Sequence, residues 1–278
     1  MSAQYKSILK FVGFFGGIQG LNMLVGLIRS KIVAVLLGPG GMGLLSMFNT
    51  VVQLLSTGTN LGIGISGVKE LSEIESKKEK ERKIAVIRTW SLIAAGIGFA
   101  VTVLTAPLIN KLSFSWGQHT VHYLALAPTV ALMAITSGEA AILKATRKMK
   151  NLASIQIITI TLSVLISIPI YYFFGQTGIV PVIFLTALTT MLASIFYSYR
   201  HFPLKLNGIR KYISEGTPMV KLGLSFVLAG ILGSGMEMYL RAFLNMQGNL
   251  EMVGFYYAGF SIAITYPSAL LNSLENDY

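Results

Sequence analysis

The 278-residue sequence contains no cysteine and few charged residues. Without cysteine the chain can form no disulfide, no thiolate metal site and no thiol nucleophile. Charged residues make up 12% of the sequence and hydrophobic residues 53%, whereas soluble domains are typically about 25% charged. This balance excludes an ordinary soluble domain and indicates that most of the chain contacts lipid.

The sequence also lacks the signatures of common enzymes. It contains no Ser/His/Asp set, Walker motif or zincin motif. Residues 62–67 have the glycine spacing of a dinucleotide-binding motif, but they end an apolar run and do not join a strand to a helix. His119 and His122 lie three residues apart with no cysteine or carboxylate nearby in sequence, so no metal site is predicted. We therefore expect a protein that is not an enzyme and needs no cofactor.

Eight apolar runs are each long enough to cross a bilayer as a helix, which takes about 20 residues. They cover residues 8–36, 42–66, 88–110, 120–142, 152–174, 177–199, 220–246 and 252–274. The first run is too long for the apolar part of a signal peptide and leads directly into a second span, so we expect it to be retained. The sequence predicts an all-α polytopic membrane protein with about eight transmembrane helices.

Positive charge falls in every second gap between these runs and predicts the topology. Eighteen of the 22 Lys and Arg residues precede the first run or lie between runs two and three, four and five, and six and seven. These are Lys6, Lys10; Lys69, Lys77, Lys78, Lys80, Arg82, Lys83, Arg88; Lys144, Arg147, Lys148, Lys150; Arg200, Lys205, Arg210, Lys211 and Lys221. Because Lys and Arg resist translocation, these segments and the N-terminus are predicted to be cytoplasmic.

The formal net charge is +11, and we expect the anionic head groups of membrane lipids to balance it. The positive residues are spread over successive loops without interleaved aromatic residues, which is the pattern of contact with anionic head groups. Nucleic acid, whose phosphates also attract basic proteins, is not an expected partner.

Glycine and proline mark the connections between spans. Residues 37–43 and 175–178 are predicted to form short turns on the outer side. Residues 70–83, which mix both signs of charge, are predicted to form a solvated cytoplasmic helix. Residues 200–221 read as a linker in which Pro218 breaks the helix before the seventh span. We place a domain boundary there, with a six-helix lobe at 1–205 and the linker and first two helices of an incomplete second lobe at 206–278.

Polar side chains recur at helical spacing on four of the predicted spans. Because buried polar groups are costly in a membrane, such stripes indicate a shared hydrophilic cavity between spans one, two, seven and eight. The stripes comprise Gln19, Asn22 and Arg29, with Lys31 nearby; Asn49, Gln53, Ser56 and Asn60; Ser234, Glu237, Arg241 and Asn245; and Tyr257, Ser261, Thr265, Ser268, Asn272 and Glu275. Spans five and six are more uniformly apolar and are expected to face lipid or pack behind.

The charged members of these stripes have alternative interpretations. Arg29 and Lys31 lie near the predicted outer interface, where they could extend to lipid head groups. Glu237 and Arg241 are spaced four residues apart and could form a structural ion pair. Glu139 lies near the cytoplasmic end of span four, where it could serve as an anchor.

Several short segments resemble bacterial polysaccharide flippases, the O-antigen translocases often called Wzx, of the multidrug/oligosaccharidyl-lipid/polysaccharide exporter superfamily. The end of the first span and the following turn, Arg29 to Leu45, resemble that family. The basic stretch 141–150 is similar to its loop after span four, residues 168–181 to its fifth-to-sixth hairpin, and residues 215–219 to the start of its second lobe. The resemblance extends over essentially the whole chain, through diffuse motifs.

The resemblance implies two six-helix lobes that alternate access around a central cavity, in the inner membrane of a bacterium. The implied cargo is an undecaprenyl-pyrophosphate-linked oligosaccharide such as an O-antigen repeat unit of lipopolysaccharide, moved from the cytoplasmic to the periplasmic leaflet. Arginine forks suit phosphate, so the implied substrate-binding residues begin with the cations. The full set is Arg29, Arg241 and Lys31 for pyrophosphate, and Asn22, Asn49, Gln53, Asn60 and Tyr257 for sugars.

The same resemblance implies coupling to an ion and to other polysaccharide-assembly proteins. Glu237 and Glu139 are the candidate sites for a proton or sodium ion, because a desolvated carboxylate titrates nearer neutrality. This sequence reaches only the eighth span, which predicts an incomplete second lobe. A multidrug exporter of the same fold and an inactive fragment are the alternatives. A multidrug exporter of cationic drugs would favour an acidic cavity.

Overall fold

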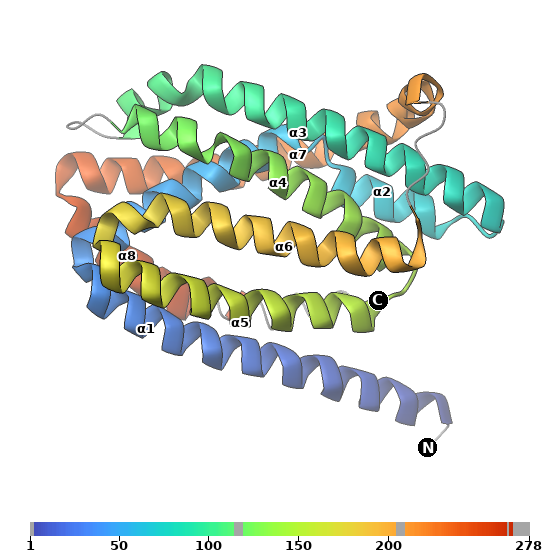
Figure 1. Ribbon diagram of the computed structural model, residues 1–278, viewed down its shortest axis with the longest axis horizontal. Helices are drawn as coiled ribbons and strands as arrows, with labels where there is room; N and C mark the ends of the chain where they lie inside the picture. The colour runs from blue at the N-terminus through green and yellow to red at the C-terminus, as the bar shows by residue number, and fades with distance from the viewer. Residues whose placement is uncertain (1–2, 114–118, 204–208, 266, 269–278) are drawn as a thin grey trace.

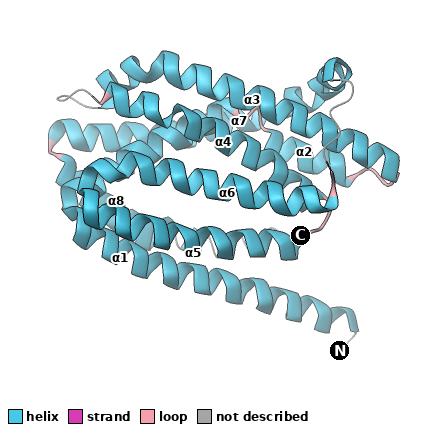
Figure 2. Ribbon diagram, in the orientation of Figure 1, coloured by secondary structure: helices cyan, strands magenta, loops and turns pink. Residues whose placement is uncertain are grey.

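The computed structural model describes residues 3–113, 119–203, 209–265 and 267–268, and side chains from Met23 onward except those of Ile209 and Arg210. Within this part of the chain every regular element is a helix (Figures 1 and 2). The elements are α1 (Ala3–Thr59), α2 (Ile63–Ser72), α3 (Lys77–Ser113), α4 (Thr120–Ala145), α5 (Met149–Phe174), η1 (Gly175–Gly178), α6 (Ile179–His201), α7 (Ile209–Gln247), α8 (Leu250–Phe260) and η2 (Ser261–Thr265).

Helix α1 consists of two passes joined at a sharp turn. Its 57 residues would extend about 85 Å as one straight helix, far beyond a hydrocarbon core of ~30 Å. Gly38 interrupts the helical geometry with φ 68° and ψ 176°, directly before Pro39. In Figure 1 the blue ribbon runs from the N-terminus to the far end of the bundle and then returns. The predicted turn at 37–43 is therefore confirmed.

The number and length of the apolar helices are those of a multi-pass membrane protein. Five helical segments are long and apolar enough to cross a membrane. One of them, 149–201, contains both α5 and α6, which reverse at η1, where Gly175 has a φ of 55°. The all-α polytopic fold and the turn at 175–178 are confirmed. The eighth predicted span covers 252–274, and its end lies outside the described residues. The predicted domain boundary at 205/206 also lies outside them, so the division into two lobes stays a prediction.

Two of the predicted connections are wrong. Residues 70–83 are not one helix, because α2 ends at Ser72 and α3 begins at Lys77. Ser76 and Glu79 have the Ser-x-x-Glu spacing that favours a new helix start, and Glu79 lies in the first turn of α3. Pro218 does not break the chain before span seven, since α7 continues through it. Membrane helices tolerate proline because neighbouring groups satisfy the freed backbone.

A buried ion pair joins three helices at the end of the bundle that carries the basic segments. Arg88 on α3 donates from Nε to Glu139 Oε1 on α4 over 2.9 Å, and from Nη2 to Oε2 over 3.2 Å. Nη2 also donates to Ser198 Oγ on α6, and Nη1 to the Phe202 carbonyl. Both charged side chains are less than 5% exposed. The guanidinium thus connects α3, α4, α6 and the segment after α6.

Glycines allow the last helices to approach the first ones closely. A Cβ atom on Gly254 of α8 would collide with the Pro39 carbonyl oxygen of α1, and one on Gly43 would collide with the Leu250 carbonyl oxygen. Similarly, Gly223 of α7 lies against the backbone of Gly62 at the start of α2. Small residues at such crossings are the usual means of helix packing in membranes. Helices α7 and α8 are therefore packed closely against α1 and the start of α2.

Replacement of Gly254 by alanine should loosen the contact between α1 and α8. The added methyl group overlaps backbone, which cannot rotate away, so we expect a loss of about 1–3 kcal/mol. Thermal unfolding of the purified protein in detergent measures this loss. Gly259→Ala is the matched control on the same helix, since nothing lies within 4 Å of its added Cβ. Equal unfolding temperatures for the two variants would contradict the close approach.

Replacement of Glu139 by alanine should destabilise the protein strongly. The substitution leaves the Arg88 guanidinium buried without its counter-charge, which typically costs about 3–5 kcal/mol. The same thermal unfolding experiment measures the effect, with Glu73→Ala in the exposed turn after α2 as control. If both variants unfold at the wild-type temperature, the buried pair does not stabilise the bundle.

Candidate substrate-binding site

A cavity of about 680 Å³, with both apolar and polar side chains in its walls, lies among α1, α4, α6 and α8. The returning half of α1 contributes amide and hydroxyl side chains, α4 and α6 contribute hydroxyls, and α8 contributes one tyrosine. These lining residues are Asn49, Gln53, Ser56 and Asn60; Thr129, Thr136 and Ser137; Thr186 and Thr190; and Tyr257. The mixture offers many hydrogen-bond donors and acceptors, as a site for hydroxyl-rich ligands requires.

A smaller cavity of about 150 Å³ adjoins the first and has a cationic side chain in its wall. The two cavities share Asn49, Ile183, Thr186 and Tyr257. The smaller one also reaches Val33 and Met42, close to the Gly38 turn, and Arg29 forms part of its wall. The combined space thus leads from a neutral hydrophilic region to a positively charged one.

Among the described residues that line these two cavities, Arg29 is the only basic one, and none is Asp or Glu. Its Nε donates to Ser167 Oγ on α5 over 3.1 Å. Within the described part of the chain its two terminal nitrogens make no hydrogen bond or ion pair. The site is therefore net positive, and two guanidinium nitrogens are available to a ligand.

The structure brings together five of the eight predicted substrate-binding residues. Arg29, Asn49, Gln53, Asn60 and Tyr257 all line the two connected cavities. Lys31 is exposed and lines neither cavity. The side chain of Asn22 lies outside the described residues.

Arg241 occupies a separate buried position between α7, α1 and α8. Its Nη1 donates to Glu237 Oε2 and its Nε to Ser46 Oγ, each over 2.9 Å. The guanidinium lies 5.4 Å from the ring centre of Phe260, within cation–π range. Glu237 is about half exposed, at 47%, whereas Arg241 is almost fully covered. Glu237 and Arg241 are thus paired with each other, as the alternative interpretation anticipated.

Glu139, the second candidate coupling residue, is bound bidentately to Arg88 and lies outside both cavities. Its two oxygens are held in the ion pair that joins α3 and α4. Glu237 and Glu139 therefore differ in access, since only Glu237 exposes much of its side chain. Coupling of either residue to an ion stays a prediction.

Sequence reasoning missed the contribution of α4 and α6 to the cavity. The expectation that span six faces lipid or packs behind is wrong for the face that carries Thr186 and Thr190. Span seven, by contrast, contributes no residue to either cavity. Thr186 Oγ1 bonds the Val182 carbonyl over 2.8 Å, as threonine does in many apolar helices. The four-residue spacing of Thr186 and Thr190 was the available signal, but threonine pairs are too common in lipid-facing helices to be decisive.

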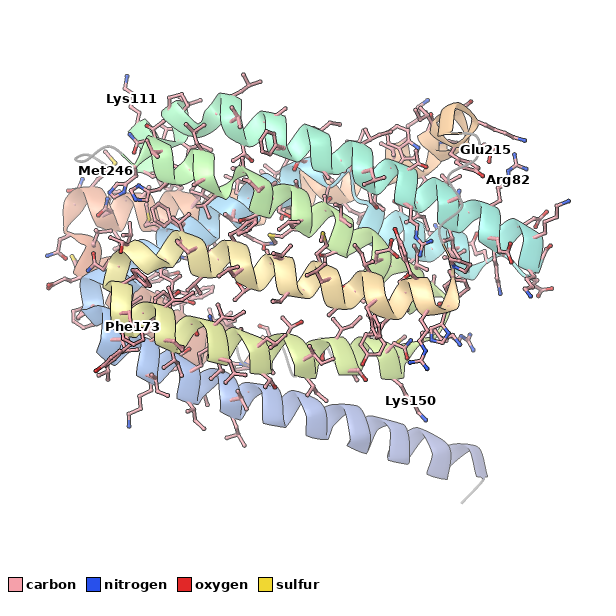
Figure 3. All side chains as sticks on the ribbon, viewed as in Figure 1. Arg82, Lys111, Lys150, Phe173, Glu215 and Met246 are labelled. Carbon is pink, nitrogen blue, oxygen red and sulfur yellow. The ribbon has the colours of Figure 1, made fainter. Side chains whose placement is uncertain are left out.

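A surface ion pair lies at the basic end of the bundle, away from the cavities. Arg82 on α3 donates from Nε to Glu215 Oε2 on α7 over 2.7 Å, and Figure 3 shows the two labelled residues adjacent to each other there. The hydrogen bond from Arg82 lowers the pKa of the Glu215 carboxyl group. A lowered pKa keeps this carboxylate charged, so the contact persists at neutral pH and weakens only in acid. Screening by solvent makes its contribution small.

Comparison with known proteins is consistent with this architecture. No curated protein matches the sequence. The fold is similar to the inward-facing conformation of a multidrug resistance MATE family transporter of the MOP superfamily, with a TM-score of 0.64 at 16% sequence identity. The match covers 90% of this chain and 60% of that one, so this chain spans less than two thirds of the transporter's length.

The sequence itself matches a family model described as polysaccharide biosynthesis protein over residues 8–275. This match extends over nearly all of the 278 residues and includes every residue that lines the two cavities. It confirms the family indicated by the turn and loop motifs. The chain therefore belongs to the polysaccharide biosynthesis protein family and has the helical fold of MOP transporters.

Proposed function

We propose that this chain carries the cargo site of a flippase that moves undecaprenyl-pyrophosphate-linked oligosaccharide from the cytoplasmic to the periplasmic leaflet. The observation that carries the proposal is the pair of adjoining cavities, the larger with uncharged hydrogen-bonding side chains in its walls and the smaller with Arg29. A lipid-linked oligosaccharide has the matching chemistry, with uncharged hydroxyls in its sugars and negative charge at the pyrophosphate. Family membership supports a substrate in polysaccharide biosynthesis.

The two regions would divide the cargo between them. The 680 Å³ cavity has the volume of a pocket for a small molecule or a few sugar rings. Its asparagine, glutamine and hydroxyl side chains can both donate to and accept from sugar hydroxyls. The guanidinium of Arg29 would hold the pyrophosphate, to which it can donate two parallel hydrogen bonds. Arg241, already paired and buried, would instead position α7 against α1.

Transport by alternating access would require the motion of two lobes. The first six spans and the two helices that follow would provide the binding site and its first contacts with the second lobe. The exposed carboxylate of Glu237, beside Arg241, remains the better candidate for coupling to a proton or sodium ion. We further propose an inner-membrane location with a cytoplasmic N-terminus, from the distribution of Lys and Arg.

A multidrug exporter is the second candidate, because the similar solved structure is a multidrug resistance transporter. Cationic drugs are best held by carboxylates and aromatic rings. The residues that line the two cavities include no carboxylate and carry a cation instead. This electrostatic sign favours an anionic cargo over a cationic one.

Replacement of Arg29 by alanine should abolish translocation. Removal of the cation takes away the charge and the bidentate donors that hold pyrophosphate, so surface polysaccharide should fall at least tenfold. The assay is complementation of a flippase-deficient bacterial strain, with this chain alone and with the chain extended by a related second lobe. Lys111→Ala removes a cation from an exposed site outside both cavities and serves as the control.

Wild-type levels of surface polysaccharide with Arg29→Ala would contradict the role of Arg29 in translocation. Drug resistance in a sensitised host, without rescue of polysaccharide by the chain or its extended form, would favour the exporter instead.

A further inference from the structure

One side chain in the wall of the smaller cavity has an unexplained polar group. Tyr171 on α5 is 1% exposed and lines the 150 Å³ cavity. Its hydroxyl has no hydrogen-bond partner within the described part of the chain. A buried polar group without a partner typically costs about 1–3 kcal/mol, and phenylalanine would fill the same space without that cost. A ligand that accepts a hydrogen bond from this hydroxyl would remove that cost.

The surroundings of Tyr171 identify the chemistry of that ligand. Ser167 lies one helical turn before Tyr171, so both face the same side of α5. Ser167 is fully buried and accepts the hydrogen bond from Arg29 Nε. This bond places the guanidinium beside Tyr171, which lies within electrostatic range of Arg29 and of Tyr257. Arg29 and Tyr171 thus both line one small cavity.

We propose that Tyr171 is a further binding residue of this site, which donates its hydroxyl proton to an anionic phosphate oxygen held by Arg29. Neutral tyrosine and charged arginine both act as donors here, and an acceptor with several negative oxygens satisfies both at once. A volume of 150 Å³ corresponds to about five water molecules at ~30 Å³ each. This space is large enough for a phosphate or pyrophosphate group.

The inference deepens the proposed function and depends on it only for the source of the phosphate. Free pyrophosphate and a lipid pyrophosphate present the same oxygens to Arg29 and Tyr171. The two sources are distinguished by a comparison of inorganic pyrophosphate with undecaprenyl pyrophosphate as probes. Tighter binding of the lipid probe would indicate that the adjoining apolar or polar walls also contact the cargo.

Replacement of Tyr171 by phenylalanine should weaken the binding of inorganic pyrophosphate to the purified protein about tenfold. This is the loss expected for one hydrogen bond to a charged group. Titration calorimetry in detergent measures the dissociation constant, with Arg29→Ala expected to remove binding entirely. Tyr172→Phe is the matched control, because the neighbouring tyrosine is 70% exposed and does not line the cavity.

Thermal unfolding provides an independent measurement on the same variant. Tyr171→Phe removes a hydroxyl that has no partner, so the free protein should be at least as stable as wild type, and pyrophosphate should stabilise it less. Equal pyrophosphate affinity for Tyr171→Phe and wild type would overturn the inference. Equal weakening by Tyr171→Phe and Tyr172→Phe would overturn it as well.

The outcomes separate this inference from the proposed function. Binding of pyrophosphate that depends on Tyr171, together with failure to rescue a flippase-deficient strain, would support the phosphate site and reject oligosaccharide flipping. Rescue that needs Arg29, together with pyrophosphate binding that is insensitive to Tyr171→Phe, would reject the inference and leave the flippase proposal in place.

Discussion

The fold depends on the requirement that every polar group within a membrane protein finds a partner or an aqueous space. Lipid offers no hydrogen bonds, so an unpaired charge inside the bundle is far more costly than one at a soluble surface. This chain places Arg88 and Arg241 in its interior and gives each a carboxylate and a hydroxyl as partners. Where the chain satisfies a cation fully, the site holds helices together, and where it does not, the site is available to a ligand.

The contrast among Arg29, Arg88 and Arg241 illustrates this principle. Arg88 donates to a carboxylate, a hydroxyl and a backbone carbonyl, and its ring contact with Tyr199, 4.1 Å from the guanidinium carbon, leaves little surface uncovered. Arg241 has a carboxylate, a hydroxyl and aromatic neighbours. Arg29 bonds a single serine and borders a cavity. Residue type alone does not distinguish these roles; the number of satisfied donors does.

Much of the architecture could be predicted from the sequence, because the relevant signals are local. Apolar run length predicts the spans, and Gly38 and Gly175 mark turns that need a positive φ. The ends of helices were less predictable where two local sequence signals favour different boundaries. Charge spacing over 70–83 favours one helix, yet Ser76 and Glu79 favour a new start, and the structure follows the latter. Pro218 is read as a breaker from local chemistry, but tertiary packing allows α7 to continue.

The binding site was predictable only in part, because a cavity is a property of several helices. The face of Asn49, Gln53 and Asn60 could be derived from spacing within one span. The partners of that face depend on the three-dimensional order of the helices, which places α4 and α6 opposite it. Buried Tyr171 carried no sequence signal, since Tyr171 and Tyr172 are identical letters with opposite exposure.

The position of the cavity also bears on how binding and transport are divided along the chain. Its walls come from α1, α4, α5 and α6, and α8 adds only Tyr257. The close glycine contacts of α7 and α8 lie on other faces of α1 and α2. The residues that we propose to bind an anion thus come almost entirely from the first six spans. If the first lobe binds the ligand and the second is needed for movement, a substitution can abolish transport without abolishing binding.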